Sequence, residues 1–336
     1  MKAKKLISLL LALALGFSLA ACSGDTAETG GPSETSSGGD ESTYRIGVFF
    51  KDSSSSFWRY VAQGCEDRAE ELGVEWVEYS PTNYTDSAGQ MSMLEDAIAS
   101  GIDAICVAAI DSTAIVDTLV KAEEAGIPVI VFNTLIPDFE ETGMQRCFVG
   151  IDNVEASNSV TELILSEHDY EADVVVLEGT PATQMNADRA GTATDVCNQY
   201  EGVNIVASQP CYATRETAMT TMENILQSTS EIDVVWALND PTALGALQAI
   251  EGAGLSGIDI VSIDGTPEAI AAIINERGIK YTVDQAPFDM GALVVQAAYD
   301  ILEGNEIESV IRCGGTIIGP ENAVEHMETY YSDYEY

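Results

Sequence analysis

Short apolar runs alternate with longer segments of helical period from Tyr44 onward. Fully apolar runs such as "AICVAAI" and "PVIVF" are typical of strands buried on both faces, whereas the segments between them repeat apolar residues at helical spacing and often end at glycine. Because strands and helices alternate, we expect parallel, right-handed βαβ units. Ten strands are predicted, at residues 45–50, 74–79, 104–109, 128–132, 147–151, 173–177, 203–207, 234–238, 258–263 and 281–283.

Ten strands are more than a single domain of this kind usually contains, and a chain of 336 residues is long enough for two domains. We therefore predict an α/β fold with two doubly wound, parallel-sheet lobes of the Rossmann-like kind, joined by three hinge crossovers. The N-terminal lobe is expected to contain residues 44–151 and 286–312, and the C-terminal lobe residues 152–285 and 313–336.

Polar and aromatic residues follow the predicted strands in both halves of the chain. Ligands of doubly wound sheets bind beyond the carboxyl ends of the strands, so these residues are the candidates for a binding site. They are Lys51 to Trp58, Asp111, Asn133 with Thr134, Thr180 to Arg189, Cys211 with Tyr212, Asn239 with Asp240, Asp264, and Gln285.

Two adjacent polar residues, Asn239 and Asp240, stand where a buried strand gives way to a helical pattern. Asp240 precedes Pro241, which is favoured as the first helical residue, so helix capping is sufficient to explain Asp240. Asn239 has no such local role, and we predict that it faces a ligand. Asp111 precedes Ser112 and is better interpreted as a cap than as a ligand-binding residue.

The first residues have the pattern of an export signal. Lysines precede an apolar run of 14 residues from Leu6 to Leu19, which is too short for an ordinary membrane span. The run ends in Leu-Ala-Ala-Cys at Cys22, which resembles the lipobox of bacterial lipoproteins; a cleaved signal with an incidental cysteine is the alternative. We predict a signal peptide at residues 1–21, a lipid anchor on Cys22 and a flexible acidic Gly/Ser tether at residues 22–43.

The chain is strongly acidic. Its 55 aspartates and glutamates all follow the predicted signal, whereas three of its 14 lysines and arginines lie within it. This balance argues against nucleic acid and anionic membrane surfaces as partners. It also makes Arg189 conspicuous, since no other lysine or arginine lies between Arg146 and Arg215.

Sequence motifs of catalysis, nucleotide binding and metal binding are missing. The chain has no phosphate loop, GxGxxG, GxSxG or HExxH, and it has two histidines, His168 and His326. The six cysteines after Cys22 have no CxxC spacing, and they are either disulfides or buried thiols. No cofactor or metal is therefore predicted, and an enzyme is disfavoured, although paired carboxylates remain possible. Amides, carboxylates, an arginine and aromatic faces suit a neutral polyol.

Several motifs resemble a known family. In order and spacing, "NIVASQPCYATRE", "ALNDPTALGAL", "VSIDGTPEAI" and "YTVDQAPFDMG" closely resemble the C-terminal lobe of the ribose-binding group of periplasmic sugar-binding proteins, which have the type I solute-binding fold. The segments "IGVFFKDSSSSFWRYVAQGCEDRAEELG" and "IPVIVFN" are similar to the first lobe of that group. The resemblance spans Tyr44 to about Gly319 and implies the solute receptor of an ABC importer, with a sugar held between two lobes.

The resemblance also implies a set of ligand-binding residues. Phe57 and Trp58 match the aromatic pair of the family, Asn133 stands where an Asp or Asn binds hydroxyl groups, Arg189 matches the sugar-binding arginine, and Asn239, Asp264 and Gln285 match polar residues of the second lobe. Five of these residues have a structural alternative: core packing for Phe57 and Trp58, a turn for Asn133, a surface ion pair for Arg189 and a helix cap for Asp264.

The sequence departs from the ribose binders at three of the matching positions. Thr134 replaces an arginine, Ala108 replaces an asparagine, and Ala213, beside Tyr212, stands where the second lobe has an aromatic residue. These changes are compatible with the fold but put ribose itself in doubt.

The expected protein is an extracytoplasmic, lipid-anchored, monomeric receptor without catalytic activity. Its expected partners are a monosaccharide (a pentose or hexose), the permease of an ABC transporter, and the membrane through the N-terminal lipid. A sensory protein that presents a sugar-like signal or a nucleoside to a membrane receptor is the alternative, and a lipid-anchored hydrolase is a third, disfavoured hypothesis.

Overall fold

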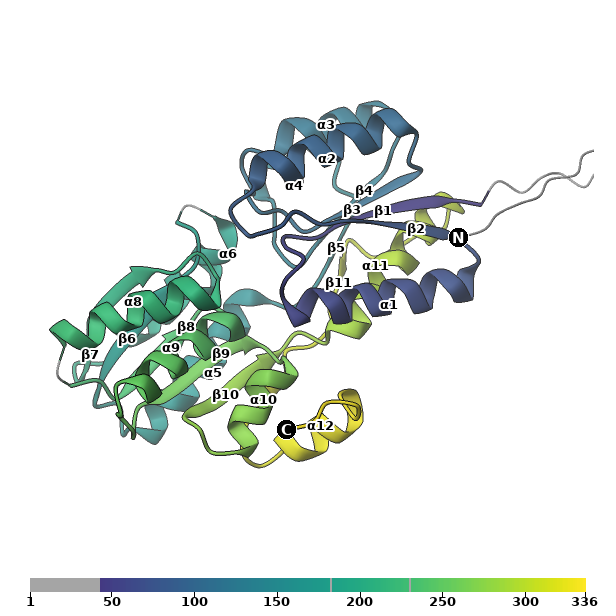
Figure 1. Cartoon of the computed structure of the whole chain (residues 1–336). Coiled ribbons are helices and arrows are strands. Elements are labelled where there is room, and N and C mark those ends of the chain that lie inside the picture. The colour runs from purple at the N-terminus through teal and green to yellow at the C-terminus, as the bar shows by residue number, and fades with distance from the viewer. Residues whose placement is uncertain (1–42, 182, 230) are drawn as a thin grey trace, which may run out of the picture. The chain divides into compact units, whose positions relative to one another are not determined.

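A computed structural model describes residues 43–181, 183–229 and 231–336 (Figure 1). The predicted signal peptide, the lipid anchor at Cys22 and all but the last residue of the predicted tether lie outside the described residues. Within the described part, no helix is both long enough and apolar enough to span a membrane.

The first of two sheets contains six parallel strands in the order β11-β5-β4-β3-β1-β2. Its strands are β1 (Arg45–Phe49), β2 (Glu75–Tyr79), β3 (Ala104–Val107), β4 (Val129–Phe132), β5 (Cys147–Val149) and β11 (Val310–Ile311). The helices of this half are α1 (Ser56–Leu72), α2 (Ser87–Ser100), α3 (Val116–Glu124), α4 (Pro137–Glu140) and α11 (Pro287–Leu302).

The second sheet also has six strands, in the order β12-β10-β9-β8-β6-β7. Its strands are β6 (Ala172–Glu178), β7 (Val203–Pro210), β8 (Val234–Ala237), β9 (Asp259–Asp264), β10 (Ile279–Asp284) and β12 (Ile317–Ile318). Its α-helices are α5 (Asn153–Glu167), α6 (Gln184–Asn186), α7 (Thr192–Cys197), α8 (Arg215–Ser228), α9 (Asp240–Gly252), α10 (Pro267–Ile274) and α12 (Ala323–Tyr330). A π-helical turn, η1 (Ala187–Gly191), joins α6 to α7.

The ten predicted strands are all present, and the two doubly wound α/β sheets confirm the predicted fold class. Two further strands, β11 and β12, were not predicted, because two residues are too few to show a periodicity. All pairings between the ten predicted strands are parallel, as expected, and the added strand β12 runs antiparallel to β10 at the edge of the second sheet. The chain passes from the first sheet to the second after β5, returns after β10 and crosses again between β11 and β12.

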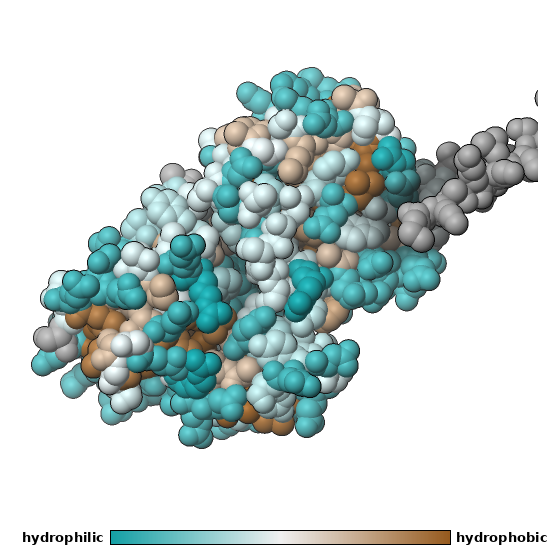
Figure 2. Space-filling model, viewed as in Figure 1, coloured by the Kyte–Doolittle hydropathy of each residue, from teal (hydrophilic) through white to brown (hydrophobic). Residues whose placement is uncertain are grey.

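Each sheet is covered on both faces, as its apolar strands require. In β1, Ile46 and Val48 belong to one buried apolar cluster and Phe49 belongs to another, since successive side chains of a strand point to opposite faces. Helices α1 and α11, which lie side by side in Figure 1, cover one of these faces. On the outside, hydrophilic residues spread over most of the surface seen in Figure 2, in keeping with the excess of acidic residues.

Helices α1 and α11 approach each other so closely that only glycine fits at their crossing. A Cβ atom on Gly64 would lie 2.0 Å from the carbonyl oxygen of Phe288, and one on Gly291 would lie 2.0 Å from that of Val61. Both obstacles are backbone atoms, which cannot move aside as a flexible side chain does. The two glycines therefore fix the distance between the helices.

We expect Gly291→Ala to destabilise the protein by about 3 kcal/mol, because the added methyl group forces the two helices apart. Gly252→Ala is the matched control, since a Cβ on that residue of α9 meets nothing within 4 Å, and it should be neutral or slightly stabilising. Urea unfolding monitored by circular dichroism measures both changes. Equal midpoints for the two variants would contradict the steric argument.

Candidate functional site

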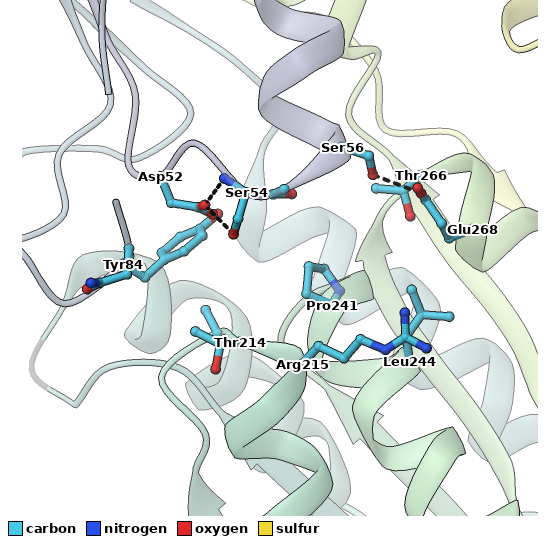
Figure 3. A pocket seen from close by; sticks show the side chains of 13 residues that line it. Asp52, Ser54, Ser56, Tyr84, Thr214, Arg215, Pro241, Leu244, Thr266 and Glu268 are labelled. Carbon is cyan, nitrogen blue, oxygen red and sulfur yellow. Dashed lines mark hydrogen bonds between the residues drawn. The ribbon is translucent and has the colours of Figure 1, made fainter. Parts of the chain in front are cut away.

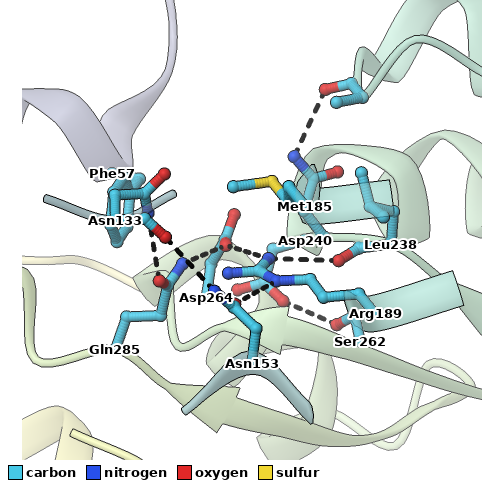
Figure 4. A network of polar contacts seen from close by, with 12 residues as sticks. Phe57, Asn133, Asn153, Met185, Arg189, Leu238, Asp240, Ser262, Asp264 and Gln285 are labelled. Carbon is cyan, nitrogen blue, oxygen red and sulfur yellow. Dashed lines mark hydrogen bonds and ion pairs between the residues drawn. The ribbon is translucent and has the colours of Figure 1, made fainter. Parts of the chain in front are cut away.

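Four of the residues predicted to bind a ligand form one buried polar network (Figure 4). Gln285 donates from Nε2 to Asp264 Oδ1 at 2.7 Å and accepts at Oε1 from Asn133 Nδ2 at 3.1 Å. Arg189 approaches Asp264 Oδ1 with Nη1 at 3.4 Å. All four side chains are buried, and they come from the ends of β4, β9 and β10 and from η1. The network thus joins Asn133, at the end of β4 in the first sheet, to residues at the strand ends of the second sheet.

Arg189 reaches the network from the π-helical turn, a type of turn that is frequent at functional sites. Its Nε donates to Asn153 Oδ1 at 2.7 Å, and Nη1 also donates to the carbonyl oxygen of Leu238 at 3.2 Å. Its Nη2 is buried and has no hydrogen-bond partner among the described residues. Burial lowers the pKa of Arg189, and the neighbouring Asp264 opposes that shift. A buried guanidinium therefore retains an unused donor.

Asp264 titrates near neutrality. Burial and the nearby Asp240 raise the pKa of Asp264 to about 7, against the opposing effect of Arg189 and of the hydrogen bond from Gln285. Its charged form is stabilised mainly by Arg189, so a ligand that donates further hydrogen bonds to the carboxylate would stabilise that form.

Asn133 has a strained backbone at the point where it enters the network. Its φ angle is 62°, in the left-handed region that asparagine tolerates better than most other residues. Its backbone N–H bonds to the carbonyl oxygen of Val149, and its own carbonyl accepts from Asn153 Nδ2 at 3.2 Å. Such strain is common where a side chain is held for binding.

Lys51 opens the candidate stretch from Lys51 to Trp58, two residues after the end of β1, but it was not among the seven residues predicted individually to bind the ligand. Its side chain is buried, and its ammonium group donates to Thr134 Oγ1 and lies 3.7 Å from Met185 Sδ. Burial and the charge of Arg189 lower the pKa of Lys51 well below its usual value. The sequence carried one signal for this residue, the scarcity of cations in so acidic a chain. Asn153 carried none, because it begins a helix.

Phe57 and Trp58 pack into the core of the first half, as their structural alternative proposed. Both are buried; the rings of Phe50 and Trp58 stack at a centroid distance of 5.4 Å, and Phe132 meets Trp58 edge-on at 6.1 Å. The indole N–H of Trp58 donates to the hydroxyl of Tyr84 at 3.0 Å. No hydrogen bond joins either residue to the Arg189 network within the described residues.

Asn239 has the local role that the sequence analysis assigned to Asp240. Its Oδ1 caps helix α9 by accepting from Thr242 N at 3.1 Å and from Thr242 Oγ1 at 2.7 Å. Its Nδ2 donates to the carbonyl oxygen of Ala213 at 3.3 Å. The statement that Asn239 lacks a local role is therefore wrong, because its side chain already satisfies the end of the helix.

Asp240 is not a simple cap but the centre of a buried cluster of hydroxyl groups. One carboxylate oxygen accepts from Ser262 and Thr282 at 2.6 Å each, and the other accepts from Thr266 N at 2.7 Å and Thr266 Oγ1 at 2.8 Å. Burial raises the pKa of Asp240, and these bonds oppose the shift. Asp240 thus ties α9 to the end of β9 and to β10. Asp111 accepts from Thr113 N and Ala114 N in a turn, so it is not the helix cap that was predicted, because α3 begins at Val116 after Ile115.

A cavity of about 210 Å³ lies beside the network, between residues of the two halves (Figure 3). Ser56 and Tyr84 from the first half line it, opposite Ala213, Pro241 and Thr266 from the second. Ser56 Oγ donates to Glu268 Oε2 at 2.8 Å across its edge. None of the seven predicted ligand-binding residues lines this cavity. All seven are buried against neighbouring side chains. Its size suits one small solute more than a drug-sized ligand, for which pockets of about 300–1,000 Å³ are usual.

Neither a metal site nor a disulfide is present in the part of the chain that the structure describes. No group of three or more histidine, cysteine or acidic side chains is arranged to hold a metal ion there. The six cysteines after Cys22 are free thiols, and five of them are buried, which agrees with the second of the two alternatives for them.

Two doubly wound halves, with buried polar residues from their strand ends facing one another, define a two-lobed binding protein of the α/β class. The chain belongs to the periplasmic binding protein domain family, whose model matches residues 46–306. Among curated relatives, the ribose import binding protein of Bacillus subtilis is 32% identical over 308 residues, covering 92% of this chain and 96% of the relative. The xylitol-binding protein of Mycolicibacterium smegmatis is 29% identical over 322 residues, covering 94% and 86%.

Solved structures of similar proteins contain bound polyols. A solute-binding protein of Actinobacillus succinogenes with bound D-allose has a TM-score of 0.78 and 28% identity, covering 84% of this chain and 100% of the other. One from Bacillus halodurans with bound myo-inositol has a TM-score of 0.77 and 28% identity, covering 87% and 100%.

Proposed function

We propose that this protein captures a monosaccharide between its two lobes and delivers it to an ABC importer. The observation that carries the proposal is the buried guanidinium of Arg189, whose Nη2 has no hydrogen-bond partner within the described part of the chain and which stands in a network with Asp264, Gln285 and Asn133. Such a mixture of charged and amide groups provides both donors and acceptors to the hydroxyl groups of a neutral sugar. The names of the relatives, which refer to ribose, allose, xylitol and myo-inositol, support the same class of ligand.

On binding, the ligand would replace hydrogen bonds that the site residues make with each other. Sugar hydroxyl groups take the place of the bonds from Asn133 to Gln285 and from Gln285 to Asp264, and they supply an acceptor to Arg189 Nη2. A sugar that contacts both lobes favours the closed arrangement by its higher affinity for that state. The hinge consists of the three crossovers between lobes 44–151 plus 286–312 and 152–285 plus 313–336. Phe57, Trp58 and Asn239 contribute as neighbours that shape the site.

The receptor works outside the cytoplasm as a monomer, held to the membrane by a lipid on Cys22 and by the tether that follows. Its acidic surface keeps it soluble and away from anionic lipid. It needs neither a cofactor nor a catalytic group, since capture and release are changes in binding alone.

A thermal-shift screen across pentoses, hexoses, polyols and nucleosides tests the proposed function. A ligand present at a hundred times its Kd stabilises the folded protein by about 2.7 kcal/mol, which raises Tm by several degrees. We expect this response from at least one monosaccharide. Absence of any shift, confirmed by calorimetry, would count against sugar binding, and a shift with nucleosides alone would favour the sensory alternative.

Arg189→Met should reduce the thermal response to the sugar, because it deletes the donor that the network leaves unused. The expected loss of affinity is about ten- to hundredfold, as for other hydrogen bonds to charged groups. Arg277→Met is the matched control, since Arg277 forms an exposed ion pair with Glu251 on the surface. If both variants bind the sugar as the wild type does, Arg189 is not a ligand-binding residue.

A further inference from the structure

Tyr84 connects the cores of the two lobes beside the proposed site. It lies in the segment between β2 and α2, where Thr82, Asn83 and Thr85 are exposed, yet its own ring is partly buried. The ring packs against an apolar cluster of the first lobe and also against one of the second. A side chain from a polar surface loop therefore occupies the space between the lobes.

The hydroxyl group of Tyr84 accepts one hydrogen bond, but its own proton is not donated to any described residue. It accepts the indole N–H of Trp58 at 3.0 Å, and no acceptor for its own proton is found among the described residues. The carboxylates of Asp264 and Asp52 lie near enough to add to the effect of burial, which raises the pKa of Tyr84 well above its usual value. The hydroxyl thus stays protonated, and its proton is free to be donated to a ligand.

The second lobe has no aromatic side chain at the corresponding wall of the cavity. Ala213 lines the cavity and is buried, whereas the adjacent Tyr212 is 42% exposed. Both residues have left-handed backbone conformations, with φ angles of 58° and 52°. Tyr84 lines the same cavity, and Figure 3 shows its ring extending from the first lobe toward Asp52 and Ser54. Among the described residues that line this cavity, Tyr84 therefore supplies the one aromatic face.

We propose that Tyr84 is a specificity-determining residue of the sugar site. Its ring provides an apolar face for the C–H groups of the sugar, opposite the space that Ala213 leaves open, and its hydroxyl donates to a sugar oxygen. Because the ring also limits that space, it determines which sugars fit. This inference rests on the proposed function, since it names a residue of the same site.

Calorimetry with the sugar found in the screen tests the inference on the full chain. Tyr84→Phe keeps the ring and should weaken binding about fivefold, whereas Tyr84→Ala removes ring and hydroxyl and should weaken it about ten- to hundredfold. Tyr84→Ala should also change the ratio of affinities for a pentose and a hexose, which a general loss of packing would leave constant. Tyr336→Ala is the matched control, because Tyr336 is exposed and does not line the cavity.

The outcomes separate the two proposals. If Tyr84→Ala binds each sugar as Tyr336→Ala does, or loses affinity for all of them by the same factor, Tyr84 does not determine specificity. If the wild-type protein binds a sugar and only the Tyr84 variants change their preference, the inference holds. A wild-type protein that binds no monosaccharide would overturn the proposed function and this inference with it.

Discussion

Replacing Asp264 with asparagine is expected to weaken sugar binding by about ten- to hundredfold while raising the Tm of the ligand-free protein at pH 8. Binding weakens because an amide is a poorer acceptor than a carboxylate and loses the charge that faces Arg189. Stability rises because burial raises the pKa of Asp264 in spite of the ion pair with Arg189, so at pH 8 the folded state loses more by ionising the carboxylate than the ion pair returns, and an amide avoids this cost. One substitution should therefore separate the two properties.

The pH dependence of this effect follows from the pKa of Asp264, which burial raises from 3.8 to about 7. The folded state holds the proton more firmly than the unfolded state, so the resulting stabilisation is complete below about pH 4 and is lost as the pH rises through 7. The wild-type Tm should fall between pH 5 and pH 8. The Tm of Asp264→Asn should fall less over the same pH range. The fall in Tm that remains is assigned to Asp284, whose pKa burial also raises to about 7.

Differential scanning calorimetry at pH 5 and pH 8 measures the stability, and titration calorimetry measures the binding. Asn133→Ala is the comparison for binding, since it loses one neutral hydrogen bond, worth about 1 kcal/mol, where Asp264→Ala loses charge-assisted bonds worth about 1.5–3 kcal/mol. Equal losses of affinity for the two alanine variants would contradict the ranking. A Tm of Asp264→Asn that is lower than that of the wild type at pH 8 would contradict the argument from burial.

The fold was predictable because its signals are local and repeated. Strands buried on both faces are continuously apolar, and each is followed by a segment of helical period, so the order of elements follows from the sequence. The meeting of Asp264 and Gln285 was predictable for a related reason, since β9 and β10 are neighbouring parallel strands whose carboxyl ends lie at one edge of a sheet. Asn133 follows β4 of the other sheet, so its contact with Gln285 depends on how the two lobes pack. Arg189 was found through its isolation among acidic residues and through the family resemblance.

Other parts of the site depend on contacts that no local pattern records. Tyr84 stands in a polar loop and reaches the cavity through the packing of two lobes. Lys51 follows a strand as many surface lysines do, and only the neighbouring Thr134 and Met185 reveal its burial. In both cases the partners are distant in the sequence, so spacing and propensity carry no information about them.

The roles of Asn239 and Asp240 also depend on partners that local sequence patterns do not reveal. Either residue type caps helices, and the proline that follows favours the cap for Asp240. The structure gives the cap to Asn239, because the carboxylate of Asp240 is surrounded by hydroxyl groups from β9, β10 and Thr266. These partners are 22 to 42 residues away, so the role of Asp240 exists only in the folded chain.

Asp240→Ala is accordingly expected to be among the most destabilising substitutions in the second lobe, at about 3–5 kcal/mol. It leaves one backbone N–H and three hydroxyl groups without their acceptor inside a buried site, and each unsatisfied group costs about 1–3 kcal/mol, partly offset because the buried charge is removed. Asp240→Asn should cost less, since the amide keeps one acceptor oxygen but opposes a second donor to the hydroxyl groups.

Asp96→Ala, on the exposed face of α2, is the matched control and should change the free energy of unfolding by less than about 0.5 kcal/mol. Urea unfolding gives all three values. A midpoint for Asp240→Ala near that of Asp96→Ala would mean that the hydroxyl cluster around Asp240 is not what holds α9 to β9 and β10.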